Sequence, residues 1–333
     1  MGMSLNMSSL SKYQLSLQDL EAAAQLVYQV LPPTPQYSWP LLKTRFQTEV
    51  WVKHENHLPV GAFKVRGGLT YLHALLHEEP WIEGVVAATR GNHGQSIALA
   101  AKLLDLEARI VVPFGNSAEK NRAMQALGAE LIEYGQDFQE AAEYARYLAD
   151  QLRFHFVPSF HPDLVKGVAT YAWEFFKNAP ELDVVYVPVG QGSGLVGVSL
   201  VRDLLGLKTE VVGVVAAAAP AYATSMQQGE LLAMDVGPTI ADGLACRKPH
   251  PEAFALMQAR GIRFVKVSEP EIKRAMQVLF ADTHNVAEGS AAASLAAYMQ
   301  EQDKYRGGKV RVILSGGNID SHAFAEALLE QHN

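Results

Sequence analysis

The sequence has little of what would place it in several large classes of protein. It contains a single cysteine, Cys246, among 333 residues, so no disulfide within the chain is possible and a disulfide-rich scaffold is excluded. No apolar run reaches the roughly 18 residues that a membrane-spanning helix needs. The first twenty residues lack the basic start and apolar stretch of a signal peptide. We therefore expect a cytoplasmic protein with no membrane partner.

Positive charge is also scarce. The chain has 28 Lys and Arg against 35 Asp and Glu, a net charge of −7, which argues against a nucleic-acid partner because such proteins usually present a basic face. The eleven histidines show no zinc-ligand spacing, so we expect no metal. The length predicts two domains. Because no linker rich in proline or serine separates them, we expect two interleaved lobes.

Short β-branched runs alternate along the chain with amphipathic stretches. Several runs are continuous Val and Ile, which is typical of strands buried on both faces of a parallel sheet. We therefore expect an α/β fold whose open, mainly parallel twisted sheets are flanked by helices. Ser117 and Ser268 are predicted helix N-caps. The expected strands are 50–53, 85–89, 109–112, 130–133, 184–189, 211–215, 264–267 and 312–314. The expected helices are 95–106, 118–127, 138–152, 164–176, 195–204, 269–281 and 289–298.

Three glycine-rich segments each follow an expected strand and precede an expected helix, which is where ligands bind in open α/β sheets. The first, at 190–197, has the spacing G-x-G-x-x-G of dinucleotide-binding loops, but the acidic residue needed about 20 positions later is absent. Two interpretations of this segment remain: a turn that binds a phosphate group through backbone amides, or a tight turn between strand and helix without a ligand. The second, at 89–94, offers backbone amides to a carboxylate, or is an N-cap with a surface histidine. The third, at 314–320, places Ser315 at a strand tip, or is a turn capped by Asn318 or Asp320.

Lys64 has an unusual setting for a lysine. It follows a Pro-Val-Gly turn and stands among Ala62, Phe63 and Val65, where a lone lysine would normally be solvated. Removal from water lowers the pKa of a lysine and makes its neutral amine available as a nucleophile or base. A non-catalytic amino-acid or nucleotide-binding module would have no need of such an amine.

In combination, these motifs resemble the fold type II pyridoxal-phosphate (PLP) enzymes, and among them the threonine/serine dehydratase and serine racemase branch. The resemblance extends from Glu55 to Asp320. It implies a tryptophan synthase β-like architecture with a large PLP-binding domain, 1–56 and 158–333, and a small domain, 57–157, that closes over the substrate. It also implies a homodimer. The motifs that carry it are Glu55-Asn56, Pro59, Phe63 to Gly67, Gly91-Asn92-His93, Gly190 to Gly194, Glu288-Gly-Ser and Ser315 to Asn318.

The resemblance also implies roles for individual residues. Lys64 would hold PLP as a Schiff base and act as the base at Cα, with Phe63 beside the cofactor and Asn92 at its 3-oxygen. Ser315 would face the pyridine nitrogen, and Glu288 would lie near the ring. The phosphate would be cradled by Gly190, Gln191, Gly192, Ser193 and Gly194. The substrate would be received by Thr89, Arg90, Gly91, Asn92, His93, Asp242 and Gly243.

Three departures from the family pattern narrow the expected function. Arg90 stands where the racemase has a serine, so we do not expect racemisation as the main activity; Arg90 would meet an anionic or large substrate, or form a salt bridge on the loop. Residues 216–219 are alanines where relatives with a divalent cation have an acid, so no metal is expected there. The chain ends at Asn333 without a regulatory domain, so feedback inhibition is not expected.

The sequence thus predicts a PLP-dependent ammonia-lyase that converts a β-hydroxy-α-amino acid, L-threonine or L-serine, to a 2-oxo acid and ammonia. A phenylserine or hydroxyaspartate dehydratase and a serine racemase-like enzyme are the alternatives within the class. A non-catalytic binding module and a dehydrogenase are the alternatives outside it. Tyr134, Phe138 and Phe160 could line a pocket, but aromatic residues at such spacing are more often core residues, and we assign them no role.

Overall fold

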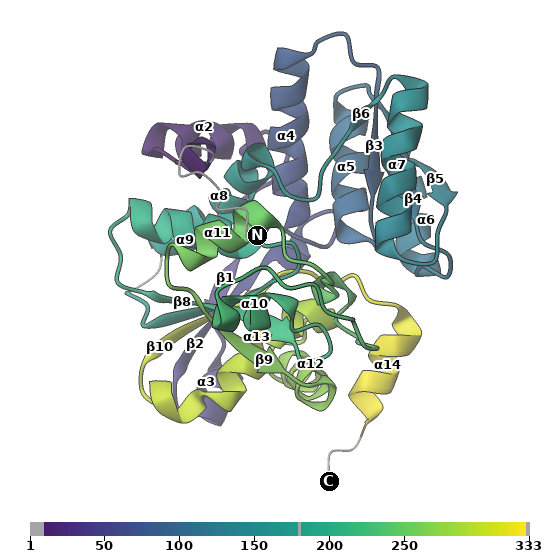
Figure 1. Ribbon diagram of the computed structural model, residues 1–333. Helices are drawn as coiled ribbons and strands as arrows, with labels where there is room; N and C mark the ends of the chain where they lie inside the picture. Colours follow the sequence, from purple (N-terminus) through teal and green to yellow (C-terminus); the bar gives the residue numbers. More distant parts are fainter. Residues whose placement is uncertain (1–9, 179–180, 331–333) are drawn as a thin grey trace.

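Two open sheets form the framework of the molecule in the computed structural model, which describes residues 10–178 and 181–330 (Figure 1). The larger sheet has the strand order β1-β2-β10-β7-β8-β9 and the smaller one β5-β4-β3-β6. Strand β1 pairs with β2 antiparallel, and the other strand pairs are parallel. The strands are β1 Gln36–Ser38, β2 Glu49–His54, β3 Gly84–Ala88, β4 Glu107–Val112, β5 Glu130–Glu133, β6 His155–Phe156, β7 Val184–Pro188, β8 Glu210–Ala216, β9 Arg263–Val267 and β10 Lys309–Leu314.

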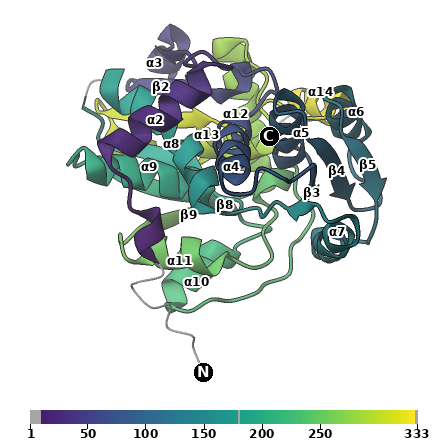
Figure 2. The same ribbon diagram turned by 90° about the horizontal axis from the view of Figure 1, so that it is seen from above.

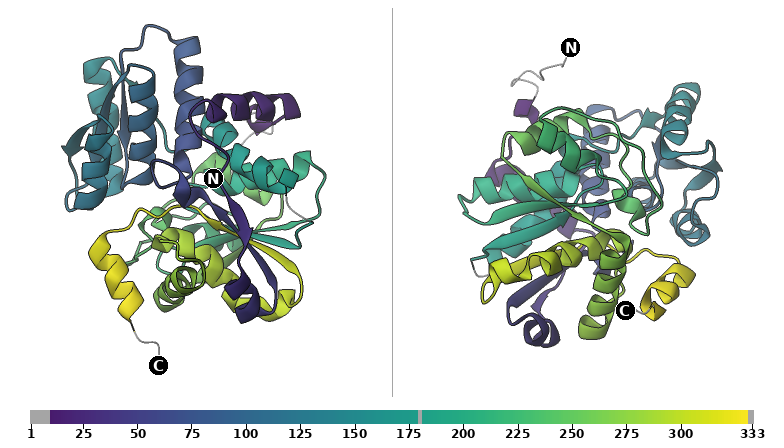
Figure 3. Two further views of the ribbon diagram at one scale, coloured as in Figure 1. Left: turned by 180° about the vertical axis from the view of Figure 1, so that it is seen from behind. Right: turned by 60° about the horizontal axis from the view of Figure 1, so that its bottom comes forward.

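Helices cover both faces of the larger sheet. Inward-facing valines of β2, β7, β8 and β10 pack on one face against α3 (Pro40–Phe46), α12 (Glu269–Thr283) and α13 (Gly289–Gln300). The opposite face packs against α8 (Pro162–Asn178), α9 (Ser193–Leu204) and α11 (Pro251–Gln258). Helix α2 (Leu17–Tyr28) lies against α8 on this side, as the rear view shows (Figure 3). Burial on both faces explains the continuous Val runs in these strands.

The smaller sheet is built on the same plan. Helices α4 (Lys64–Glu78), α5 (Asn92–Leu103) and α6 (Ala118–Ala126) lie on one side of it, and α7 (Phe138–Leu152) covers the other (Figure 2). The remaining helical segments lie near the larger sheet or at the chain ends. They are η1 Ser11–Tyr13, η2 Glu55–His57, α10 Ala221–Gln228, η3 Asp242–Leu244, η4 Gln302–Tyr305 and α14 Ser321–Leu329.

The α/β class and the mainly parallel sheets are confirmed, and each expected strand and helix has a counterpart; β5 and α7 have the expected bounds, and the others have shifted ends. Helix α5 begins at Asn92, three residues earlier than expected, because residues 92–94 form its first turn. Ser117 caps α6 by accepting from the Lys120 amide at 3.1 Å, and the Ser268 amide donates to Glu271 at 2.7 Å in a capping box at α12.

Helix α4 is the largest element that the sequence analysis did not predict. Gly67 and Gly68 stand in its second turn and disfavour a helix by propensity. Both are there for packing: a Cβ at Gly67 would lie 2.7 Å from the Leu164 carbonyl, and one at Gly68 2.3 Å from Ser96 Oγ. From the other helix, a Cβ at Gly167 would lie 2.2 Å from the Arg66 carbonyl. Close approach of α4 to α8 therefore requires glycine at positions 67 and 167, and close approach of α4 to α5 requires glycine at position 68.

The expected domain division at residues 57 and 158 stays a prediction. The four strands of the smaller sheet lie between residues 84 and 156, and the strands of the larger sheet lie outside that range. In the described part of the chain, no helix is both long and apolar enough to cross a membrane. The same residues bring together no group of three His, Cys, Asp or Glu side chains able to hold a metal ion.

Candidate active site

One pocket brings together the carboxyl ends of strands from both sheets. The segment after β3, the glycine turn after β7 and Ser315 after β10 all reach it. Every residue that the sequence analysis placed in a site lines this pocket. These residues are Phe63, Lys64, Thr89, Arg90, Gly91, Asn92, His93, Gly190, Gln191, Gly192, Ser193, Gly194, Asp242, Gly243, Glu288 and Ser315. Their individual roles remain proposals, but their meeting in one place is a property of the fold.

Lys64 is the first residue of α4, and its amine enters the pocket. Desolvation lowers the pKa of the Lys64 amine to about 8. Its Nζ donates to Ser193 Oγ at 3.1 Å and lies 5.2 Å from the centre of the Phe63 ring. The backbone is held from two sides, since Ser96 Oγ donates to the Lys64 carbonyl at 2.7 Å and the Phe63 amide donates to the Ser315 carbonyl at 3.0 Å. The structure thus presents a weakly basic amine in a fixed position.

The glycine turn opposite Lys64 forms a cradle of backbone groups. Gly192 has φ +101°, a left-handed conformation that glycine adopts without strain, and α9 begins directly after it at Ser193. A Cβ at Gly190 would lie 2.1 Å from the Gly243 carbonyl, so no larger residue fits there. The amide groups of the first turn of a helix are unpaired within the helix and favour an anion. The turn therefore suits a phosphate group, and its role in holding one stays a prediction.

The segment after β3 is fixed by one buried hydroxyl. Thr89 Oγ1 accepts hydrogen bonds from the amides of Gly91 at 2.9 Å and Gly94 at 3.2 Å. Half-buried His93 lines the pocket, so the interpretation of it as a surface histidine is wrong. Desolvation lowers the pKa of His93 to about 3, and the ring is neutral at pH 7.

Asn92 joins this segment to the larger sheet. Its Nδ2 donates to Glu288 Oε1 at 2.8 Å, and its Oδ1 accepts from Asn318 Nδ2 at 2.8 Å. Asn318 also donates to the Val60 carbonyl at 2.8 Å, so it fixes Asn92 and does not cap α14. Desolvation, with a further contribution from Asp242, raises the pKa of Glu288 to about 7. Glu288 is therefore a group that holds a proton near neutral pH.

Three side-chain contacts connect α6 and its N-cap residue with η3 and with the start of α14. Ser117 Oγ donates to Asp320, and Lys120 Nζ forms an ion pair with Asp242. Ser321 Oγ donates to Glu119 at 2.6 Å. Asp320 stands at the N-cap position of α14, but its carboxylate accepts from Ser117 and does not cap the helix. The prediction of a turn capped by Asp320 is therefore wrong.

The sequence analysis missed Lys120 and Phe138, which both line the pocket. Lys120 lies in an amphipathic helix, where a lysine is normally solvated, and its partner Asp242 is 122 positions away. Burial opposes its charge, but Asp242 and Glu288 together raise the pKa of Lys120. Phe138 is the first residue of α7; it packs against the core of the smaller sheet and also lines the pocket, so both interpretations left open for it apply. Only its position after Asp137, an N-cap, marked it as a helix start.

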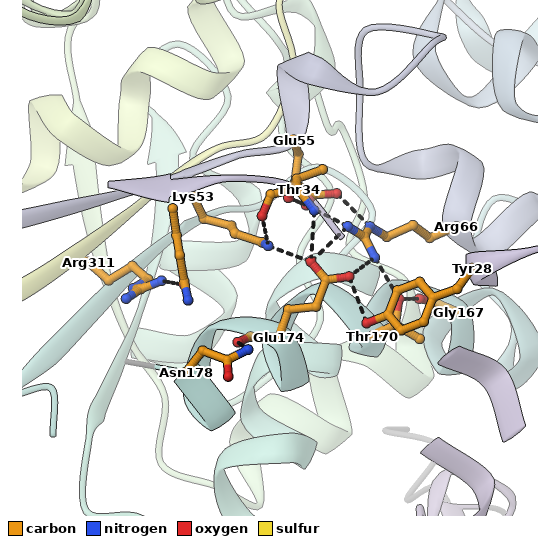
Figure 4. Close-up of polar contacts among 11 residues, drawn as sticks. Tyr28, Thr34, Lys53, Glu55, Arg66, Gly167, Thr170, Glu174, Asn178 and Arg311 are labelled. Atoms are coloured by element: carbon orange, nitrogen blue, oxygen red, sulfur yellow. Dashed lines mark hydrogen bonds and ion pairs between the residues drawn. The ribbon is translucent and has the colours of Figure 1, made fainter. Parts of the chain in front are cut away.

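A buried ionic network lies behind the first turn of α4 (Figure 4). Arg66 contacts Glu55 at 2.7 Å and Glu174 at 2.6 Å, and Lys53 contacts Glu174 at 2.5 Å. All four side chains are at most 5% exposed. Thr170 accepts from Arg66 at 3.0 Å. The network thereby joins β2, η2, α4 and α8, and holds Arg66 two residues after Lys64.

Charges within this network are balanced. Burial disfavours its charged forms, but Arg66 and Lys53 together lower the pKa of Glu174, and Glu55 and Glu174 raise the pKa of Arg66. Arg311 lies to one side of the network, and the view shows its guanidinium directed away from both carboxylates (Figure 4). It donates instead to Gln36 Oε1 and lies against the rings of Trp51 and Phe175, whose centres are 5.5 and 4.8 Å away.

The pocket fits pyridoxal phosphate on three observations. An amine with a pKa of about 8 can bond to an aldehyde, and the glycine turn suits a phosphate. Polar atoms that are buried in the pocket wall have no partner among the described residues, as is expected where a polar ligand supplies the partner. These atoms are His93 Nε2, Glu288 Oε2 and Ser290 Oγ. A reactive lysine, an anion cradle and unpaired polar groups define an enzyme that binds a phosphorylated carbonyl cofactor covalently.

Comparison with known proteins identifies that class. The model of the family described as pyridoxal-phosphate dependent enzyme matches residues 27–316, and the chain belongs to this family. The L-threonine ammonia-lyase of Thermotoga maritima is 34% identical over 307 residues, 92% of this chain and 76% of that protein. The L-threo-3-hydroxyaspartate ammonia-lyase of Saccharomyces cerevisiae is 32% identical over 308 residues, 92% of this chain and 94% of that protein.

A solved structure has the same fold over nearly all of its length. The processed form of threonine deaminase isoform 2 from Solanum lycopersicum superposes with a TM-score of 0.88 at 28% identity, covering 99% of this chain and 96% of that one. The chain spans 58% of the length of the biosynthetic L-threonine dehydratase of Haemophilus influenzae, with which it is 32% identical. The predicted family and cofactor are confirmed, and the dehydrogenase and the non-catalytic binding module are set aside.

Proposed function

We propose that this protein is an ammonia-lyase that converts a β-hydroxy-α-amino acid to a 2-oxo acid and ammonia. The substrate loses its β-hydroxyl as water, and hydrolysis of the resulting enamine releases ammonia. The observation that carries the proposal is the Lys64 amine, which has a pKa of about 8 and faces an anion-binding turn in the same pocket. Relatives named for L-threonine and L-threo-3-hydroxyaspartate support this reaction class.

We assign each group of pocket residues a separate role in this reaction. When bound, PLP withdraws electrons from the Cα of the amino acid and makes its proton acidic. Lys64 Nζ holds the cofactor in the resting enzyme and then accepts the proton from Cα. Residues 190–194 hold the phosphate through backbone amides. Thr89, Gly91, Asn92 and His93 bind the α-carboxylate of the substrate and so orient Cα towards Lys64.

Three further residues set the position and protonation of the reacting groups. Asn92, held by Glu288 and Asn318, presents an amide to the ring oxygen of the cofactor. Glu288, with its pKa near 7, keeps a proton available on that side. Ser315 offers a hydroxyl to the ring nitrogen, and a hydroxyl does not stabilise a proton there as a carboxylate would. The pocket thus favours prompt loss of the β-hydroxyl.

A substrate panel tests the reaction class. Release of 2-oxo acid is measured with L-threonine, L-serine, L-threo-3-hydroxyaspartate and L-threo-phenylserine. At least one of the four is expected to give a kcat/KM above about 10⁴ M⁻¹s⁻¹, the lower end of the usual range for enzymes. Absence of release from all four, by a preparation that carries stoichiometric PLP, would contradict the proposal.

The pKa of Lys64 predicts how cofactor uptake depends on pH. The neutral amine attacks the aldehyde, and about a tenth of it is neutral at pH 7 when the pKa is about 8, against about 0.03% for an ordinary lysine. The rate of holoenzyme formation from apoprotein and PLP is therefore expected to rise about tenfold per pH unit below pH 8 and to level off above it. Stopped-flow absorbance checks this, and a rate that still rises steeply at pH 10 would refute the lowered pKa.

Three further parts of the proposal concern the domain bounds, the oligomeric state and the cellular location of the protein. We infer a large PLP-binding domain, 1–56 and 158–333, and a small domain, 57–157, that closes over the substrate. Two copies would pair in a cytoplasmic homodimer, as the resemblance to the dehydratases implies. Light scattering coupled to size-exclusion chromatography gives the molar mass in solution, and a value near 36 kDa would mean a monomer.

A further inference from the structure

Among the residues that the structure describes, Arg90 is the charged residue of the pocket that has no hydrogen-bond or ion-pair partner. The pocket wall has four other charged side chains: two lysines, an aspartate and a glutamate. Each of them contacts a polar group. Their contacts are Lys64 to Ser193, Lys120 to Asp242, and Glu288 to Asn92. Arg90 is exposed and makes no hydrogen bond or ion pair with the residues that the structure describes. The salt bridge on the loop, one of two expectations for this residue, is therefore not formed in the described part of the chain.

The backbone that carries Arg90 is nevertheless rigid. Thr89, immediately before it, is 3% exposed, and its hydroxyl holds the amides of Gly91 and Gly94. Helix α5 begins two residues after Arg90. On the other side, the Lys120 side chain packs over Gly91, where an added Cβ would lie 2.7 Å from Lys120 Cδ. The base of the Arg90 side chain is thus fixed at the pocket, and its guanidinium is free to bind a ligand.

The pocket also has a surplus of positive charge where Arg90 stands. Lys120 is neutralised by Asp242, and the amine of Lys64 is used by the cofactor. The phosphate of the cofactor belongs to the glycine turn, which lies after a strand of the other sheet. An unpaired guanidinium beside the segment that receives the α-carboxylate can bind a second anionic group.

On the basis of the proposed lyase function, we infer that Arg90 binds a second carboxylate, on the side chain of the substrate. The preferred substrate is then a dicarboxylic β-hydroxy amino acid. A guanidinium and a carboxylate form two parallel charge-assisted hydrogen bonds, which give both strength and orientation. A phenyl side chain would stack on the guanidinium and on Phe138, but that contact is weaker than a charge pair.

Kinetics of Arg90 variants test the inference. In Arg90→Gln, kcat/KM for L-threo-3-hydroxyaspartate is expected to fall about 100-fold, as for loss of one partner of a desolvated ion pair, while that for L-threonine changes less than about threefold. Arg90→Lys is expected to recover part of the loss, since it keeps the charge without the planar fork. Arg122→Gln is the matched control, because it removes the same charge from an exposed position of α6 outside the pocket.

A binding measurement separates this inference from the lyase proposal. L-Aspartate and L-2-aminobutyrate differ at the end of the side chain, and neither carries a β-hydroxyl to eliminate. Calorimetry on the holoenzyme is expected to show at least tenfold tighter binding of L-aspartate, and Arg90→Gln is expected to abolish that difference. This comparison stands even if no substrate is turned over, which would contradict the lyase proposal alone.

Three results would overturn the role of Arg90. An equal loss with L-threonine and L-threo-3-hydroxyaspartate would place Arg90 at the α-carboxylate, which both substrates share. A higher dissociation constant for PLP in Arg90→Gln would place it at the cofactor phosphate. A preference for L-threo-phenylserine that survives the substitution would mean that the side-chain site is apolar.

Discussion

Lys64→Ala is expected to lower the rate of 2-oxo acid release by about 10⁴-fold or more, which is the size of effect seen when a covalent catalytic residue is removed. The amine both binds the cofactor and accepts the Cα proton, so its loss removes two steps together. The variant is expected to fold normally, because Lys64 stands at the start of α4 and its amine has a hydrogen bond to Ser193 and no ion pair among the described residues. Circular dichroism and the steady-state rate provide the comparison.

Adding a primary amine shows whether Lys64→Ala loses activity because the catalytic amine is missing or because the structure is disturbed. A small amine such as methylamine can enter the space left by the side chain and replace the base in part. Recovery of activity in proportion to the concentration of the neutral amine is the expected result. Activity of Lys64→Ala above about 1% of wild type, without added amine, would show that another residue does this work.

Glu174→Ala is expected to lower the free energy of unfolding by about 3–5 kcal/mol, because it leaves Lys53 and Arg66 buried with one carboxylate between them. Urea unfolding followed by fluorescence gives the value. Glu130→Ala is the matched control: it removes a carboxylate that is 58% exposed and paired with Arg109, and it should change the stability by at most about 1 kcal/mol.

Replacing Arg66 together with Glu174 tests whether an unpaired buried charge causes the loss of stability in Glu174→Ala. If an unpaired buried cation causes the loss, then Arg66→Met combined with Glu174→Met should restore part of the stability that either change alone removes. Additive losses from the two substitutions would contradict this explanation. A loss below about 1 kcal/mol in Glu174→Ala would show that water reaches the network.

Local patterns in the sequence were enough to predict the parallel strands, and the family resemblance was needed to predict the pocket. Continuous valines marked β7 and β8 as buried strands, and glycines directly after β7 marked the turn that faces Lys64. Both signals lie within a few neighbouring residues. The carboxyl ends of β7 and β10 meet at one edge of the larger sheet, but the segment after β3 belongs to the smaller sheet, and only the family resemblance implied that it joins them.

Pairs distant in sequence were not predictable in the same way. Arg66 and Glu174 are 108 positions apart, and Lys120 and Asp242 are 122 apart. Each of these residues alone resembles a solvated charge on a helix or loop, because nothing nearby in the sequence shows that its partner will be buried with it. Helix α4 was missed for a related reason: its glycines oppose a helix locally, and they are explained by the approach of α8 at Gly67 and of α5 at Gly68.

Borohydride reduction of the holoenzyme tests the central claim most directly. Reduction fixes PLP irreversibly to the amine that carries it, and mass spectrometry of the digested protein then identifies the modified residue. The account predicts one pyridoxyl group per chain, on Lys64. Modification of a different lysine, or an unmodified Lys64 in a preparation that had turned over substrate with bound PLP, would contradict it.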